Sequence, residues 1–106
     1  MSEHGEHDAS ERAYAEHAPG KELPAIDFVT FVLSMRQAAL LHLGDAPDPD
    51  SGSHEQDLPM ARQTIDLLAM LQDKTRGNLS GDEERALSQA LYDLKSRFVE
   101  VAKAKK

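Results

Sequence analysis

The chain has 106 residues, of which 40% are hydrophobic, 5% are aromatic and none is tryptophan, so the sequence predicts one small domain. It contains no cysteine, which excludes disulfides, thiolate metal sites and cysteine catalysis. The formal net charge is −7, and the overall acidity argues against a nucleic-acid-binding protein.

Residues 1–24 predict a disordered acidic tail. They are rich in Glu, His, Ala and Gly, contain proline and glycine breakers, and show no sustained apolar period. His4 and His7 lie beside carboxylates, a combination that can bind a metal ion. Because a flexible tail does not preorganise ligands, we expect no metal site there.

The first predicted helix, about 27–43, is apolar over an arc of roughly 220°, where a surface helix needs only about 100°. Asp27 suits the N-cap of this helix, and Gly44 suits a left-handed C-cap. So wide an arc requires cover on two sides, and in so small a protein we expect a second molecule to supply one of them. The candidate oligomer-interface residues are Val29, Leu33, Arg36 and Leu40.

Arg36 lies inside this apolar arc and permits two interpretations. Its guanidinium pairs with Asp66 or Asp73 of the next helix, because a buried cation requires a partner. Alternatively, its apolar stem lies along the helix and its charged group reaches solvent, which is the interpretation we prefer.

Residues 45–57 predict a long polar loop with two prolines and a glycine. Its acidic residues do not fit the spacing of a calcium-binding loop, so we expect no ion there. A second helix is predicted at about 58–76 by the spacing of Ala61, Ile65 and Leu68.

The last predicted helix, about 81–102, begins at a capping box formed by Ser80 and Glu83. Its apolar residues alternate at steps of four and three, which predicts a seam packed against other helices. The members of this seam are Leu87, Leu91, Leu94, Phe98 and Val101. The predicted fold class is therefore all-α: a three-helix domain over residues 25–103, built as a helix, a long loop and a helical hairpin, after a disordered N-terminal tail.

Residues 74–78 form a polar segment, Lys-Thr-Arg-Gly-Asn, with two interpretations. It closes the second helix as a C-cap, or its cations and loop amides hold an anion. We prefer the cap, because anions favour the N-termini of helices and this is a C-terminus.

Several separated segments occur in order along the chain: 27–34 with 43–44, 61–68, 74–80 and 91–94. In these segments the chain resembles a bacterial family catalogued as domain of unknown function 1844. The family has no established activity, so the resemblance assigns no catalytic or binding residue. It implies a small helical protein of the bacterial cytoplasm.

The sequence offers no paired nucleophile and base and no phosphate-binding glycine loop, so we expect no enzyme, no catalytic residue and no cofactor. The expected function is a homodimer or higher homo-oligomer in the cytoplasm that binds or scaffolds another protein. One alternative is a peripheral membrane module that uses the first helix, although its polar face lacks the cations that favour anionic lipid. Another is weak nucleic-acid binding by the basic second half.

Overall fold

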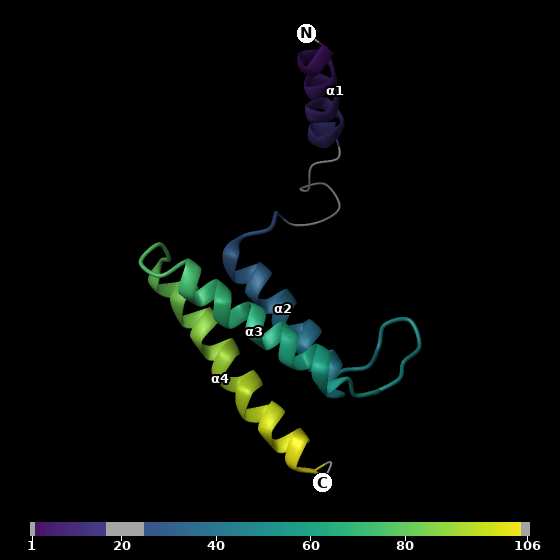
Figure 1. Cartoon of the computed structure of the whole chain (residues 1–106), viewed down its shortest axis with the longest axis vertical. Helices are drawn as coiled ribbons and strands as arrows, with labels where there is room; N and C mark the ends of the chain where they lie inside the picture. The colour runs from purple at the N-terminus through teal and green to yellow at the C-terminus, as the bar shows by residue number, and fades with distance from the viewer. Residues whose placement is uncertain (1, 17–24, 105–106) are drawn as a thin grey trace.

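The computed structural model describes residues 2–16 and 25–104 of the chain. These residues form four helices and no strand, which confirms the all-α class (Figure 1). The helices are α1 Ser2–Glu16, α2 Phe28–Leu43, α3 Leu58–Lys74 and α4 Gly81–Ala104.

The N-terminal tail differs from the expectation, because residues 2–16 are helical where the sequence predicted no regular structure. Six of the eight residues 9–16 are alanine, glutamate or arginine, which are good helix formers, so local propensity favours a helix despite the acidity of the segment. Residues 17–24 lie outside the described residues. Among the described residues α1 contacts none of the other helices, so the packed domain begins with α2.

Helices α2, α3 and α4 form a three-helix bundle in which each helix contacts the other two. Figure 1 shows α3 and α4 as a hairpin joined by a short turn, with α2 lying against both. The bounds of the three helices agree with the expected ones to within two residues. The hairpin and the long loop between α2 and α3 are also as expected.

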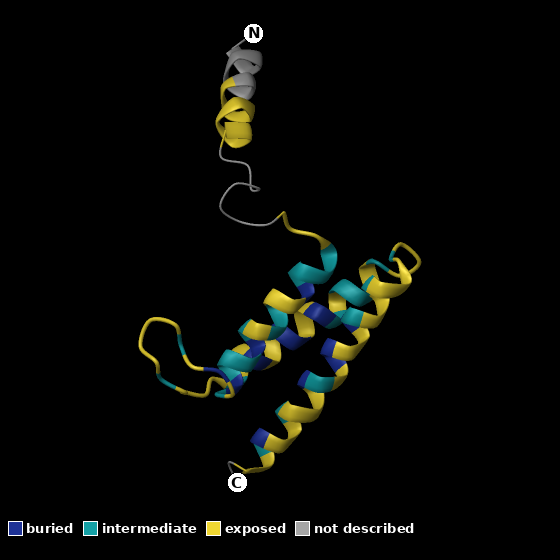
Figure 2. Cartoon of the chain, turned by 180° about the vertical axis from the view of Figure 1, so that it is seen from behind, coloured by how far each residue is buried: buried dark blue, intermediate teal, exposed yellow. Residues whose placement is uncertain are grey.

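The core lies along the bundle axis, and Figure 2 shows the buried residues on the inner faces of the helices. Its largest fully buried side chains are Val32, Leu43, Leu68, Leu87 and Leu94. In the predicted seam of α4, four of the five residues are buried, and Phe98 is half-buried and packs against the core. The predicted period therefore identified the inner face of α4.

The helix ends carry the predicted caps. The Asp27 carboxylate accepts the backbone N–H of Thr30 at 2.8 Å, and Gly44 ends α2 in the left-handed region with φ +84°. At the start of α4 the capping box is reciprocal: the Ser80 hydroxyl accepts the Glu83 N–H at 3.2 Å, and the Glu83 carboxylate accepts the Ser80 N–H at 2.8 Å.

We expect Ser80→Ala to lower the free energy of unfolding by about 1 kcal/mol, because the Glu83 N–H loses its acceptor at the helix start. Urea denaturation measures the change. Ser96→Ala is the matched control, since Ser96 is exposed in the middle of α4, where alanine is the better helix former. Equal midpoints for Ser80→Ala and the wild-type chain would contradict the capping role.

Candidate interaction surfaces

The four residues nominated as an oligomer interface lie on one edge of α2, because they follow one another at steps of four, three and four. Leu33 is 53% exposed, and the other three are half-buried. Leu40 also packs against the core. We call this edge, Val29, Leu33, Arg36 and Leu40, the α2 edge.

Helices α3 and α4 cover more of the apolar arc of α2 than the sequence argument allowed. Val32, Ala39 and Leu43 are buried, and Phe28 and Met35 pack against the core from the same helix. The apolar surface of α2 that remains available to a second molecule is therefore narrower than the whole apolar arc. Leu33 is the most exposed large apolar residue of this remaining surface.

Arg36 makes no ion pair within the described part of the chain. Its two nominated partners are engaged elsewhere: Asp66 pairs with Arg62 at 3.3 Å, and Asp73 pairs with Arg76 at 3.2 Å. The half-buried Arg36 fits the preferred interpretation, in which the stem lies along the helix and the guanidinium reaches solvent.

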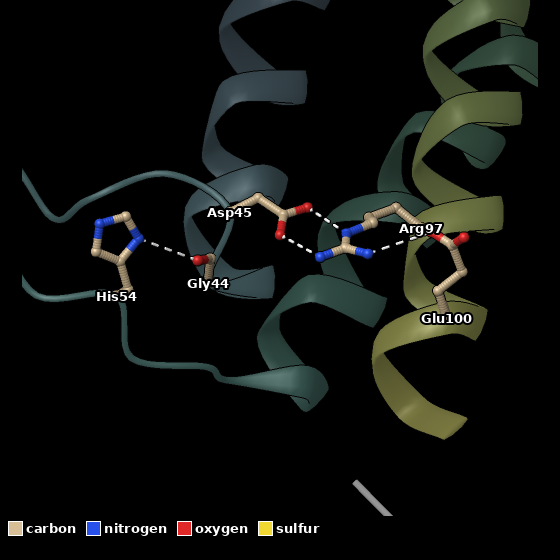
Figure 3. Close-up of polar contacts among 5 residues, drawn as sticks. All are labelled: Gly44, Asp45, His54, Arg97 and Glu100. Atoms are coloured by element: carbon tan, nitrogen blue, oxygen red, sulfur yellow. Dashed lines mark hydrogen bonds and ion pairs between the residues drawn. The ribbon is translucent and has the colours of Figure 1, made fainter. Parts of the chain in front are cut away.

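A charged junction fixes the end of α2 to α4. Figure 3 shows the Arg97 guanidinium facing the Asp45 carboxylate, to which it donates two hydrogen bonds of 2.7 and 2.8 Å. Arg97 also donates to Glu100 at 3.2 Å. The planar fork of arginine matches a carboxylate in this two-pronged geometry, so the pair holds the start of the loop against α4. No local pattern in the sequence indicates this pair, because its two residues are 52 positions apart.

The hydrogen bonds from Arg97 hold the pKa of Asp45 below its usual range. A carboxyl with a lowered folded-state pKa stabilises the fold above its unfolded pKa of about 3.9, and this contribution is lost as the pH falls through the folded pKa. We therefore expect the wild-type chain to be more stable than Asp45→Asn at pH 6, with the difference shrinking below about pH 4. Because both side chains are partly exposed, the difference at pH 6 should be at most about 1 kcal/mol.

Urea denaturation at pH 6 and at acidic pH measures this dependence. Asp50→Asn is the control, since Asp50 is an exposed acid of the same loop that makes no ion pair within the described residues. A difference between the wild-type chain and Asp45→Asn that stays constant down to pH 2 would contradict the role of the ionised carboxylate.

The loop of residues 45–57 is organised by its own polar groups. The Asp48 carboxylate accepts the backbone N–H groups of Asp50 at 2.8 Å and Ser51 at 3.1 Å. Nδ1 of the His54 ring lies 3.2 Å from the carbonyl oxygen of Gly44. Figure 3 shows the ring facing this carbonyl group. No group of three or more potential metal ligands gathers within the described residues.

The segment 74–78 has the geometry of a helix cap. The Thr75 hydroxyl donates to the Leu71 carbonyl at 2.7 Å, and Gly77 lies in the left-handed region with φ +80°. The Asn78 N–H donates to the Thr75 carbonyl at 2.9 Å. These hydrogen bonds and the left-handed Gly77 explain the polar residues of the segment as those of a turn that closes α3. This agrees with the interpretation of the segment as a C-cap.

A groove that sequence reasoning missed runs between α3 and α4, with a volume of about 350 Å³. Ile65, Phe98 and Val99 supply its apolar side chains, and the Arg62–Asp66 ion pair and Lys95 complete its lining. The available signal was Val99, an apolar residue of α4 that falls outside the predicted seam.

No helix among the described residues combines the length and the apolar content needed to cross a membrane. A protein-family model described as Domain of unknown function (DUF1844) matches residues 25–100, which include α2, α3 and nearly all of α4. No curated protein and no solved structure matches the chain.

Proposed function

Because this chain belongs to the DUF1844 family, whose description assigns no activity, we infer its function from its own surface: we propose a non-enzymatic protein that forms a homodimer through α2 and binds another cytoplasmic protein. The observation that carries the proposal is the α2 edge, on which Leu33 is half-exposed between the half-buried Val29 and Leu40. A leucine left in water in this way favours contact with a second apolar surface.

Two-fold pairing suits this edge. In a symmetric dimer each contact occurs twice, so one exposed leucine per chain contributes two buried side chains to the interface. Full burial of a leucine is worth about 1.5–3 kcal/mol, so the half that is exposed here contributes roughly half of that for each chain. The exposed Ile26 just before α2 adds apolar area, and the unpaired Arg36 can lie at the rim of the interface.

Binding of a second protein is supported by α3. Met60, Leu67 and Met70 are exposed, and their spacing places them on one side of the helix. Flexible methionine side chains are common on surfaces that adapt to a partner. A dimer through α2 would present two copies of this row.

We expect the wild-type chain to have the mass of a dimer at micromolar concentration, and Leu33→Glu to reduce it to that of a monomer. A buried carboxylate in a two-fold interface would face its own copy, which is costly. Light scattering measures the mass, and far-ultraviolet circular dichroism confirms that the helices persist. Ser34→Glu is the matched control, since Ser34 is the next residue, is exposed and lies outside the α2 edge.

Two results would defeat the self-association: a monomeric wild-type chain, or a dimer unaffected by Leu33→Glu. The partner-binding part is checked by affinity capture from native extract. There a Met60→Lys, Met70→Lys double variant should dimerise normally and lose the bound protein. If the wild-type chain and the double variant captured the same protein in equal amounts, α3 would not be the binding surface.

A further inference from the structure

The outward face of α4 carries a stripe of cations and exposed apolar residues. It spans an arc of about 100° and contains no acidic residue, in a chain with a net charge of −7. We call it the basic stripe, and all of its members are exposed: Arg85, Ser88, Tyr92, Lys95, Ser96, Val99 and Lys103. The cations of such a face attract anionic groups, and its exposed apolar side chains are stabilised when another surface covers them.

The basic stripe borders the groove between α3 and α4, because Lys95 and Val99 belong to both. Tyr92 is 69% exposed and Val99 is 50% exposed. Lys95 makes no ion pair within the described residues. The stripe and groove together therefore offer an apolar hollow, a neighbouring aromatic ring and an available cation to one ligand.

Helix α1 has the complementary composition. Its fifteen residues include five acidic ones against a single arginine, and its one large apolar side chain, Tyr14, is 80% exposed. In the described residues α1 contacts no other helix. Figure 1 shows it as a regular helix apart from the bundle.

We propose that α1 docks on the basic stripe of its own chain, with its acidic residues facing Lys95 and its neighbouring cations and with Tyr14 covering the groove. Charge complementarity selects this occupant, because α1 is the acidic helix of the chain and the stripe is free of acids. The two tyrosines, Tyr14 and Tyr92, then share a contact that removes both rings from water.

The dimensions permit this docking. At 1.5 Å per residue α1 is about 22 Å long, and Arg85 to Val99 spans about 21 Å of α4. Residues 17–27 connect α1 to α2 and can span up to about 36–40 Å. The groove residue Ile65 lies nine positions before the end of α3, which is about 14 Å along the helix axis. This distance is well below the reach of the connection.

The same chain is favoured over a second copy because the tether keeps α1 close. Two elements joined by a short stretch of the same chain meet at an effective concentration of roughly millimolar, above that of a second copy at micromolar concentration. The docking uses α4 and α3, not the α2 edge, so it stands independently of the proposed dimer.

Paramagnetic relaxation in the full-length chain tests the docking. Because the chain has no cysteine, Ala9→Cys introduces a single site for a nitroxide on α1. We expect the amide signals of residues 92–99 to broaden at least several-fold more than those of the loop residues 48–52. In 1 M salt, or after Lys95→Glu, the broadening should fall by at least half, since screening or reversal of the charge weakens the attraction.

Lys74→Glu is the matched control, because it makes the same charge change at an exposed residue outside the stripe. It should leave the broadening unchanged. Tyr14→Ala should reduce the broadening without a change of charge. This variant therefore measures the apolar contribution to the docking separately from the electrostatic one. All measurements are repeated in the Leu33→Glu background, so that self-association through α2 does not influence the result.

Absence of broadening at residues 92–99 would overturn the docking. Broadening that resists both salt and Lys95→Glu would also overturn it, because the contact would not depend on the stripe. A mixture of nitroxide-labelled chains with isotope-labelled, nitroxide-free chains distinguishes the occupant. Broadening there as strong as within one chain would replace the docking in the same chain by an exchange of α1 between copies.

Discussion

Leu68→Ala is expected to lower the free energy of unfolding by about 3 kcal/mol, within the range of about 2–5 kcal/mol for leucine-to-alanine changes in cores. Leu68 is fully buried in the middle of α3 and belongs to the core cluster that α2 and α4 complete. Its truncation removes apolar contacts and leaves a cavity among helices that are already in contact with one another. Urea denaturation at neutral pH measures the loss.

Leu67→Ala is the matched control, because Leu67 is the neighbouring leucine on the same helix and is 38% exposed. It should cost clearly less than Leu68→Ala, about 1 kcal/mol, since more than a third of its surface stays in water and alanine is a good helix former. Equal losses for the two variants would show that α3 is rotated relative to the arrangement described above. With only three packed helices in the core, Leu68→Ala should leave a chain close to the limit of stability.

Gly44→Ala is expected to lower the free energy of unfolding by about 2–3 kcal/mol, because two costs add. The left-handed backbone, φ +84°, costs a residue with a Cβ about 1–2 kcal/mol. The new Cβ would also lie 3.0 Å from the carbonyl oxygen of His54 and 2.8 Å from Cγ of Gln56. The backbone contact with His54 cannot be relieved by a rotamer change, so the loop must shift.

Gly52→Ala isolates the first of these costs. Gly52 has φ +73°, and a Cβ there would meet no atom within 4 Å. We expect it to lose only about 1 kcal/mol, from the left-handed backbone alone. Denaturation of both variants gives the comparison, and a Gly44→Ala chain no less stable than Gly52→Ala would refute the close approach of the loop to the end of α2.

The three bundle helices could be predicted because their signals are local. The Ser80–Glu83 capping box and the left-handed Gly44 each depend on residues a few positions apart, as does the apolar seam of α4. The segment 74–78 was interpreted correctly as a cap for the same reason. Helix α1 is harder to predict, because its acidic residues and the absence of an apolar period are typical of a disordered tail, while its alanine and glutamate residues favour a helix.

The contacts between helices could not be predicted in this way. Asp45 and Arg97 are 52 residues apart, and which acid meets which cation depends on the rotation of α4 about its axis. The same uncertainty led to the nomination of Asp66 and Asp73 for Arg36, while each of these acids pairs with an arginine of its own region. The α2 edge stays a prediction, since packing within one chain does not test it.

The loop between α2 and α3 leaves the bundle and returns to it at nearly the same place. The Asp57 N–H donates to the His42 carbonyl at 2.7 Å, so the two ends of the loop are joined by a hydrogen bond. The exposed tip of the loop, beyond the contacts of Asp45 and His54, is therefore not needed to keep α2 and α3 together. Doubling the length of such a loop costs only about 0.6 kcal/mol of closure entropy. The exposed tip near Gly52 is a place where a peptide tag or a guest domain could be inserted, or new chain ends opened, without separating α2 from α3.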